Sequence, residues 1–118
     1  MCRRGEIYFS DMGSNENGSI QGGNRPVLIV SNDLANAHSP VITVVPLTGR
    51  TWKKRYLPTH VIIYHDSNSG LRSSSLALVE QITSINKSCL GEYKGYVDDQ
   101  TMKAVEHALN VQLGLQTA

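Results

Sequence analysis

Short runs of β-branched and other apolar residues, separated by polar stretches, dominate the chain and predict a series of strands. Each run is bounded by glycine, proline, serine, asparagine or aspartate, which is typical of strands joined by turns. The predicted strands cover residues 7–10, 26–31, 41–47, 59–64 and 76–79, with one more short strand within 90–97. Alternation within 59–64 puts Val61 and Ile63 on one face of its strand. Pro46 indicates that the strand 41–47 is at an edge or is bulged near its end, because proline donates no ladder hydrogen bond.

The apolar period changes near the end of the chain and predicts one amphipathic helix. From Asp98 onward, residues at helical spacing form a single apolar stripe: Met102, Val105, Ala108, Leu109 and Leu113. Asp98 is a good N-cap, because its carboxylate can accept a hydrogen bond from a backbone N–H of the first turn. The stripe is explained by core or dimer packing. Many short strands followed by one helix predict a β-rich α+β fold, a small and strongly bent β-barrel or sheet closed by the helix.

Composition limits the class of protein. With 118 residues, 40% hydrophobic and 18% charged, the chain is expected to fold as one ordinary globular domain. Its net charge of +1 means that a nucleic acid would have to bind to a local basic patch. The N-terminus lacks the apolar segment of a signal peptide and no apolar run reaches membrane-spanning length, so a soluble cytoplasmic protein is expected. The spacing of Cys2 and Cys89 is not that of metal ligands, and Cys2 lies at a terminus that is expected to fray. Free thiols are favoured, with a disulfide as the alternative.

Two loops stand out from the other polar segments. Residues 11–23 contain four glycines and no apolar period, and long loops in compact domains are often functional. Residues 50–56 contain four Lys and Arg residues and two aromatic residues: Arg50, Trp52, Lys53, Lys54, Arg55 and Tyr56. Cations neutralise phosphates and aromatic rings stack on exposed bases, so this loop is a candidate for binding a single-stranded nucleic acid. A solvated hairpin tip is the alternative interpretation. Between the strands 26–31 and 41–47, residues 32–36 could form one helical turn.

The junction between the 11–23 loop and the next strand has the composition of a phosphate site. Gly22 and Gly23 give the backbone conformational freedom and allow close approach of a ligand. Arg25 precedes Pro26, and a residue before proline favours extended geometry, so its side chain is expected at the start of the strand. A guanidinium can bind two phosphate oxygens at once. The alternative is a hairpin turn with a surface arginine.

Six segments, taken in order along the chain, resemble the MazF/PemK toxins, the endoribonuclease (mRNA interferase) components of type II toxin–antitoxin systems. The matching segments are residues 4–8, 21–29, 31–33, 39–40, 58–61 and 78–82. The resemblance implies one SH3-like barrel domain of the CcdB/MazF/PemK type over residues 1–118. It also implies a homodimer that cleaves single-stranded RNA at short sequences without a metal or cofactor. Its cognate antitoxin would inhibit it through an acidic, partly disordered segment, and the toxin–antitoxin complex would bind DNA; no membrane partner is expected.

Arg25 and Thr48 match the family's catalytic arginine and serine or threonine. In metal-free RNA cleavage the ribose 2′-OH attacks the adjacent phosphorus and leaves a 2′,3′-cyclic phosphate and a 5′-OH. This reaction needs proton removal, protonation of the leaving oxygen and stabilisation of added negative charge. Arg25 suits the third task because its guanidinium stays protonated. Thr48 can donate one hydrogen bond to a phosphate oxygen, although a hydroxyl that caps a turn is the alternative.

Further RNA contacts are predicted on both sides of this pair. On the 11–23 loop they are Ser19, Gln21, Gly22 and Gly23. Glu80 and Gln81, at the end of a predicted strand, can read base edges, or they are a structural pair at a sheet edge. Ile20 stands where members of the family commonly carry an acidic residue, so the family's base preference is not carried over to this chain.

The four histidines, at positions 38, 60, 65 and 107, form no metal-spaced cluster. His60 belongs to a matching segment but is interpreted as a structural residue at a strand start. Two alternatives to the nuclease remain. One is a non-catalytic toxin of the same fold that binds a protein such as gyrase, and the other is a degenerate member that binds RNA or antitoxin without cutting.

Overall fold

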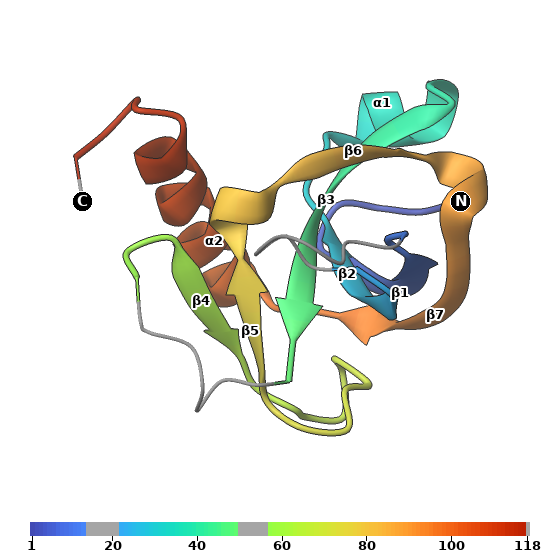
Figure 1. The fold of residues 1–118 in the computed structure, drawn as a ribbon, viewed down its shortest axis with the longest axis horizontal. Helices are drawn as coiled ribbons and strands as arrows, with labels where there is room; N and C mark the ends of the chain where they lie inside the picture. Colours follow the sequence, from blue (N-terminus) through green and yellow to red (C-terminus); the bar gives the residue numbers. More distant parts are fainter. Residues whose placement is uncertain (14–21, 50–56, 118) are drawn as a thin grey trace.

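The computed structural model describes residues 1–13, 22–49 and 57–117 (Figure 1). Strands are the commonest regular elements, and one long helix follows the last of them. The elements in chain order are β1 (Glu6–Asp11), β2 (Asn24–Ile29), α1 (Asp33–His38), β3 (Val41–Thr48), β4 (His60–Ile63), β5 (Ser75–Leu78), the 3₁₀ turn η1 (Val79–Gln81), β6 (Thr83–Asn86), the 3₁₀ turn η2 (Lys87–Cys89), β7 (Leu90–Tyr96) and α2 (Asp99–Gln112). All the predicted strands, the helical turn and the final helix are confirmed. The strand β6 is not predicted by the sequence pattern, because its residues, Thr-Ser-Ile-Asn, include a single apolar side chain.

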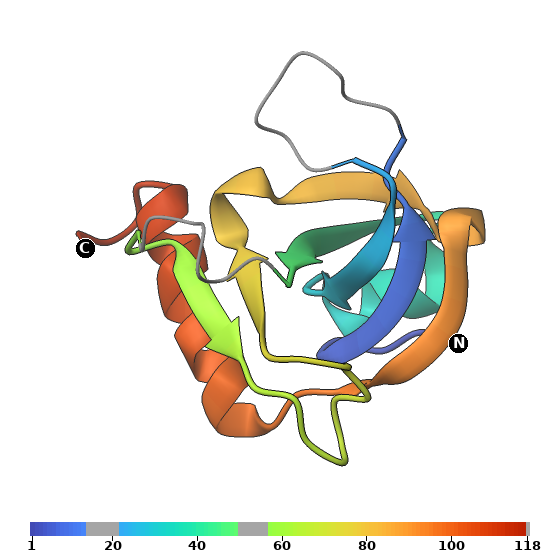
Figure 2. The same cartoon turned by 60° about the horizontal axis from the view of Figure 1, so that its bottom comes forward.

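The strands pair antiparallel in the order β4-β5-β3-β2-β1-β7, and β6 pairs with β3 beside this path. Figure 2 shows that the sheet is strongly bent, with α2 lying along β4. The expected barrel-like fold with a C-terminal helix is therefore confirmed, although the sheet does not close: among the described strands, β4 and β7 end the pairing path and are not paired with each other.

The central strand is β3, so of the two predictions for Pro46, an edge or a bulge near the strand end, the edge is wrong. One side of β3 pairs with β2, and Pro46 is opposite Val27. On its other side β3 pairs with β6 through residues 41–44 and with β5 through residues 47–48. Pro46 lies where the partner changes from β6 to β5, a position that tolerates a residue without a backbone N–H.

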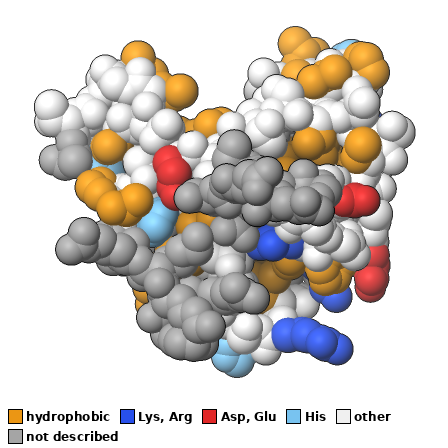
Figure 3. All heavy atoms as spheres, in the orientation of Figure 1, with side chains coloured by type: hydrophobic (Ala, Val, Ile, Leu, Met, Phe, Trp, Pro, Cys, Tyr) orange, Lys and Arg blue, Asp and Glu red, His pale blue; other side chains and the backbone are white. Residues whose placement is uncertain are grey.

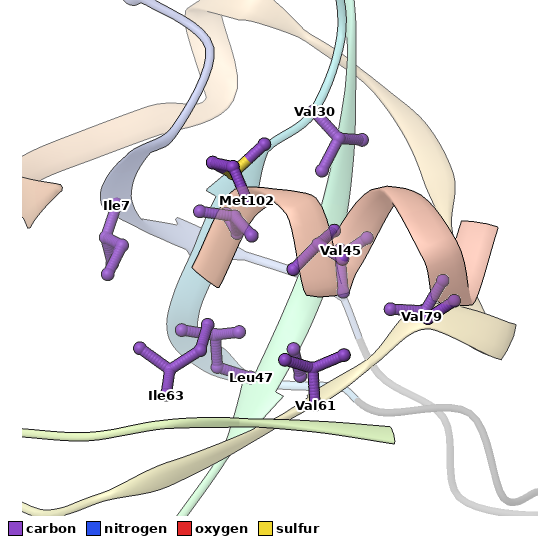
Figure 4. Close-up of a cluster of buried hydrophobic side chains, with 12 residues drawn as sticks. Ile7, Val30, Val45, Leu47, Val61, Ile63, Val79 and Met102 are labelled. Carbon is purple, nitrogen blue, oxygen red and sulfur yellow. The ribbon is translucent and has the colours of Figure 1, made fainter. Parts of the chain in front are cut away.

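Alternation along the strands divides the buried side chains into two clusters. The first cluster, covered by α2, consists of Ile7, Leu28, Val30, Val45, Leu47, Val61, Ile63, Ala77, Val79, Met102, Val105 and Ala108 (Figure 4). The second cluster, on the opposite face of β2 and β3, consists of Cys2, Val27, Ile29, Ile42 and Val44. The first cluster is the larger of the two. It is the main apolar core, and its burial is the largest favourable contribution to folding.

The helix α2 has the predicted cap and most of the predicted stripe. The Asp98 carboxylate accepts a hydrogen bond from the Thr101 backbone N–H at 2.8 Å, and hydrogen bonding to Thr101 lowers the pKa of Asp98. Met102, Val105 and Ala108 are buried, whereas Leu113 is exposed beyond the last turn. The stripe therefore packs into the core over the body of the helix only.

The N-terminus is held in place, so the prediction that Cys2 frays is wrong. The Cys2 side chain is buried in the second cluster, and the Gly5 N–H donates to the Ile29 carbonyl at 2.9 Å. Cys89 is exposed, and both cysteines are free thiols. Within the described ranges, no helix is long and apolar enough to cross a membrane.

Candidate active site

Arg25 and Thr48 meet at one end of the β2–β3 pair. The strand register places Val27 opposite Pro46 and Leu28 opposite Val45. Continued by two residues, this antiparallel register places Arg25 opposite Thr48, with both side chains on the same face of the sheet. A direct contact agrees with this, since Arg25 Nη1 donates to the Leu47 carbonyl at 3.3 Å. The structure thus brings together the two predicted catalytic residues, which are far apart in sequence.

The β1–β2 hairpin positions the guanidinium. Arg25 Nε donates to the Gly22 carbonyl at 2.8 Å, and the Gly23 N–H donates to the Gly13 carbonyl at 2.7 Å. Gly23 has a φ of +77°, which most other residues avoid. Together with the Leu47 carbonyl, these contacts hold the half-buried Arg25 side chain across the strand end. The predicted glycine flexibility therefore serves the turn, and Gly22 acts through its carbonyl on Arg25.

Two buried hydroxyl groups accompany Arg25. Thr48 ends β3, is 4% exposed and pairs with Leu76 of β5. Ser10 of β1 is opposite Arg25, is also buried, and its Oγ donates to the Cys89 carbonyl at 3.1 Å. Sequence reasoning identifies Thr48 but not Ser10, whose place beside Arg25 follows only from the strand register.

A buried histidine and a glutamate lie on the same face, two strands away. His60 of β4 is opposite Leu78 of β5, and Leu78 shares a face of β5 with Leu76, the partner of Thr48. His60 Nε2 is 2.9 Å from Glu80 Oε2, whereas Thr59 Oγ1 donates to Glu80 Oε1 at 3.1 Å.

This His60–Glu80 pair is not predicted by the sequence. His60 is 4% exposed, and its Nδ1 is buried without a hydrogen-bond partner in the part of the chain that the structure describes. Glu80 and Gln81 form the turn η1 and not a strand end, because β5 stops at Leu78. The only signal in the sequence is a polar residue at the start of an apolar strand. His60 is the first residue of β4, in agreement with its expected place at a strand start, and its contact is with Glu80, a predicted RNA-contact residue.

The remaining predicted RNA contacts lie outside the described residues. They are Ser19, Gln21, Arg50, Trp52, Lys53, Lys54, Arg55 and Tyr56, and the same is true of Ile20. On the face shown in Figure 3, charged side chains of both signs are scattered among apolar and uncharged ones. Among the residues that are described, no three His, Cys, Asp or Glu side chains are grouped so that they could hold a metal ion.

Comparisons with known proteins give consistent results. The family model described as "PemK-like, MazF-like toxin of type II toxin-antitoxin system" matches residues 3–113. Endoribonuclease MazF of Staphylococcus saprophyticus is 44% identical over 117 residues, which cover 99% of this chain and 95% of that protein.

Solved structures agree in fold. An endoribonuclease from a mycobacterial species, in complex with its cognate antitoxin, superposes with a TM-score of 0.78 at 31% identity and full coverage of both chains. MazF from Deinococcus radiodurans superposes with a TM-score of 0.77 at 22% identity, covering 96% of each chain, and this match shows the fold alone.

Proposed function

The chain belongs to the PemK-like, MazF-like toxin family of type II toxin–antitoxin systems, and on this premise we propose that it is an endoribonuclease that cuts single-stranded mRNA without a metal ion. The observation that carries the proposal is the meeting of Arg25 and Thr48 at the end of β2 and β3. The 44% identical relative named as an endoribonuclease supports the same activity. It favours the nuclease over a toxin of this fold that binds a protein target.

The proposed reaction transfers the phosphoryl group within the RNA. The ribose 2′-oxygen forms a bond to phosphorus as the bond from phosphorus to the 5′-oxygen breaks. The 2′-OH loses its proton, and the leaving 5′-oxygen gains one. Arg25, fixed by the Gly22 and Leu47 carbonyls, stabilises the negative charge that builds up on the phosphoryl oxygens. Thr48 donates one hydrogen bond to the same group in a nearly buried setting, where such a bond is stronger than in water.

Recognition of the RNA sequence is assigned to Glu80 and Gln81 on η1, which directly follows β5, the strand that pairs with the end of β3. The bonds from Thr59 and His60 fix both carboxylate oxygens of Glu80, so this side chain presents one orientation to a base edge. The basic loop 50–56 and the 14–21 segment supply the other proposed RNA contacts. The molecule is proposed to act in the cytoplasm as a homodimer that an antitoxin inhibits; the mycobacterial endoribonuclease in complex with its cognate antitoxin supports the antitoxin part.

The test is cleavage of a long single-stranded RNA in EDTA, with cut sites mapped by primer extension. The wild-type protein should give discrete cuts, and Arg25→Ala should give none. Arg3→Ala removes an exposed arginine elsewhere and serves as the matched control, which should cut like the wild type. Absence of cuts by folded wild-type protein on several unrelated RNAs would instead favour the non-catalytic binder.

A further inference from the structure

A cavity of about 520 Å³ adjoins the strand ends that carry Arg25 and Thr48. Pro26 and Gly49, the residues that directly follow those two, both line it. Strand alternation points Pro26 to the opposite face of the sheet from Arg25. The cavity and the candidate active site therefore lie on opposite faces of the sheet, at the same ends of β2 and β3. One extended RNA strand that passes around these ends can reach both.

One wall of the cavity is formed by residues 70–73 of the 66–73 loop, which packs against β7. In Figure 1 this yellow-green segment passes below the end of β3. The Asp66 carboxylate accepts hydrogen bonds from the backbone N–H groups of Asn68 and Ser69, and the Tyr96 N–H donates to the Asn68 carbonyl at 2.9 Å.

Two glycines make this close packing possible. A Cβ at Gly70, which has a φ of +67°, would lie 1.9 Å from the Lys94 carbonyl oxygen. A Cβ at Gly95 would lie 2.0 Å from the Asn68 carbonyl oxygen. No larger residue fits at either position without moving backbone, so the wall has a fixed shape and is a preformed part of the fold.

The lining combines apolar surface with cationic groups. Phe9, Pro26 and Leu71 supply flat or aliphatic surface, and Arg72 and Lys94 supply two positive charges. Lys94 Nζ lies 5.2 Å from the centre of the Phe9 ring and 3.9 Å from Glu92 Oε1, the single carboxylate in the lining. The lining is therefore net positive, and it includes Ser73 and Ser75.

We propose that this cavity binds one nucleotide of the RNA, the one next to the nucleotide pair that is cut. The inference rests on the proposed function. The base packs among Phe9, Pro26 and Leu71, whereas Arg72 and Lys94 bind its phosphate. The volume accommodates a nucleotide, and Gly49, which directly follows Thr48, lines the cavity.

The experiment measures binding of RNA oligonucleotides to wild-type protein and to Arg72→Gln, Lys94→Gln and the double variant. The first probe spans a mapped cut site and carries a 2′-deoxy sugar at the cut, so that it is not consumed. Shorter probes lack one nucleotide at a time on either side of the cut. Lys103→Gln, at an exposed position of α2, is the matched control. Circular dichroism verifies that each variant is folded.

We expect the double variant to bind the full probe about tenfold more weakly. The slope of log K against log salt should fall by about 0.7 for each phosphate that the variant no longer neutralises. Both effects should vanish with the probe that lacks the cavity nucleotide, and Lys103→Gln should bind every probe like the wild type. Unchanged affinity of the double variant, or the same weakening with every probe, would overturn the inference even if the wild type cuts RNA.

The same measurement separates this inference from the proposed function. If no RNA is cut, oligouridylate and oligoadenylate serve as probes. A cavity-dependent weakening of binding would then uphold the nucleotide site while the nuclease proposal fails. If the wild type neither cuts nor binds single-stranded RNA, both are wrong.

Discussion

The two faces of β2 and β3 have different roles at their shared end. The face under α2 packs Leu28, Val45 and Leu47 into the main apolar core. The opposite face begins as an apolar cluster around Val27 and ends in Arg25 and Thr48, both held in a buried or half-buried setting. Because alternate residues of the same strands serve the two faces, stability and chemistry can be changed separately. The substitutions of Arg25 and Leu28 below should each affect one face and leave the other nearly unchanged.

The largest expected effect is on catalysis. Arg25→Ala should lower kcat/KM for RNA cleavage at least about 1,000-fold, because it removes the positive charge that stabilises the transition state. The midpoint of thermal unfolding should change little, since the main apolar cluster is untouched. Single-turnover cleavage in EDTA and a thermal melt give the two values. A comparable fall in the activity of Arg3→Ala would show that the effect is not specific to this face.

A substitution on the α2 face should do the opposite. Leu28→Ala should lower the free energy of unfolding by about 2–5 kcal/mol, because it empties a fully buried site. Cleavage per folded molecule should stay within about threefold of the wild type, since a change of less than about 0.7 kcal/mol in the barrier is expected. Urea denaturation and cleavage at a known folded fraction test this. If activity falls as far as in Arg25→Ala, the two faces are not separable.

The apolar face is also the part that can be predicted best from the sequence. Strands 7–10, 41–47 and 59–64 and the helix after Asp98 follow from the spacing of apolar residues, because burial imposes that spacing. The strand β6 cannot be predicted in this way, because its own sequence is mostly polar. It forms because β3 has a free edge with which it can pair. The burial of Cys2, which belongs to the second cluster on the opposite face, is not predicted for a similar reason, because that cluster is built from distant strands.

The polar face is much harder to predict from the sequence. Arg25 and Thr48 are identifiable by family resemblance, and their proximity depends on the β2–β3 register, which a single sequence does not state. Ser10 beside Arg25 and His60 beside Glu80 escape prediction for the same reason. Such contacts join residues far apart in the chain and leave no local periodicity.

Removing the Thr48 hydroxyl should have a smaller effect than removing Arg25. Thr48→Val keeps the shape but loses the donor, so cleavage should slow about 10- to 100-fold, as expected for one hydrogen bond to a charged group. Thr48→Ser keeps the hydroxyl and should stay within about tenfold of the wild type. Single-turnover rates decide this. Equal rates for Thr48→Val and the wild type would assign Thr48 a purely structural role.

The His60–Glu80 pair should affect which sequences are cut more than how fast. His60→Gln removes the ring nitrogen that lies 2.9 Å from Glu80 Oε2 and leaves the bond from the Thr59 hydroxyl, so the carboxylate is less firmly oriented. We expect additional cut sites in primer extension on a long RNA, with the rate at the main site lowered about threefold to tenfold. His107→Gln, on the exposed face of α2, is the control. An unchanged set of cut sites in a folded His60→Gln protein would contradict this role.

The smallest expected effect is on alkaline stability. Burial and a hydrogen bond to Glu6 raise the pKa of Tyr8 to about 12, so the folded state keeps this proton more tightly than the unfolded chain. The free energy of unfolding should therefore fall as pH rises from about 10 to about 12, with the full contribution of Tyr8 present at lower pH. Tyr8→Phe should show a shallower decline in urea denaturation over this range. Parallel curves for the two proteins would show that Tyr8 does not couple to folding.

One measurement tests directly whether chemistry and stability are separate. It is the single-turnover rate at which Arg25→Ala and Leu28→Ala cleave one mapped RNA in EDTA, with each rate corrected for the folded fraction of the variant. We expect Arg25→Ala to be folded and inactive, and Leu28→Ala to be less stable and active. If folded Arg25→Ala cleaves RNA within about tenfold of the wild-type rate, the barrier has changed by less than about 1.4 kcal/mol. The end of β2 and β3 would then not be the active centre.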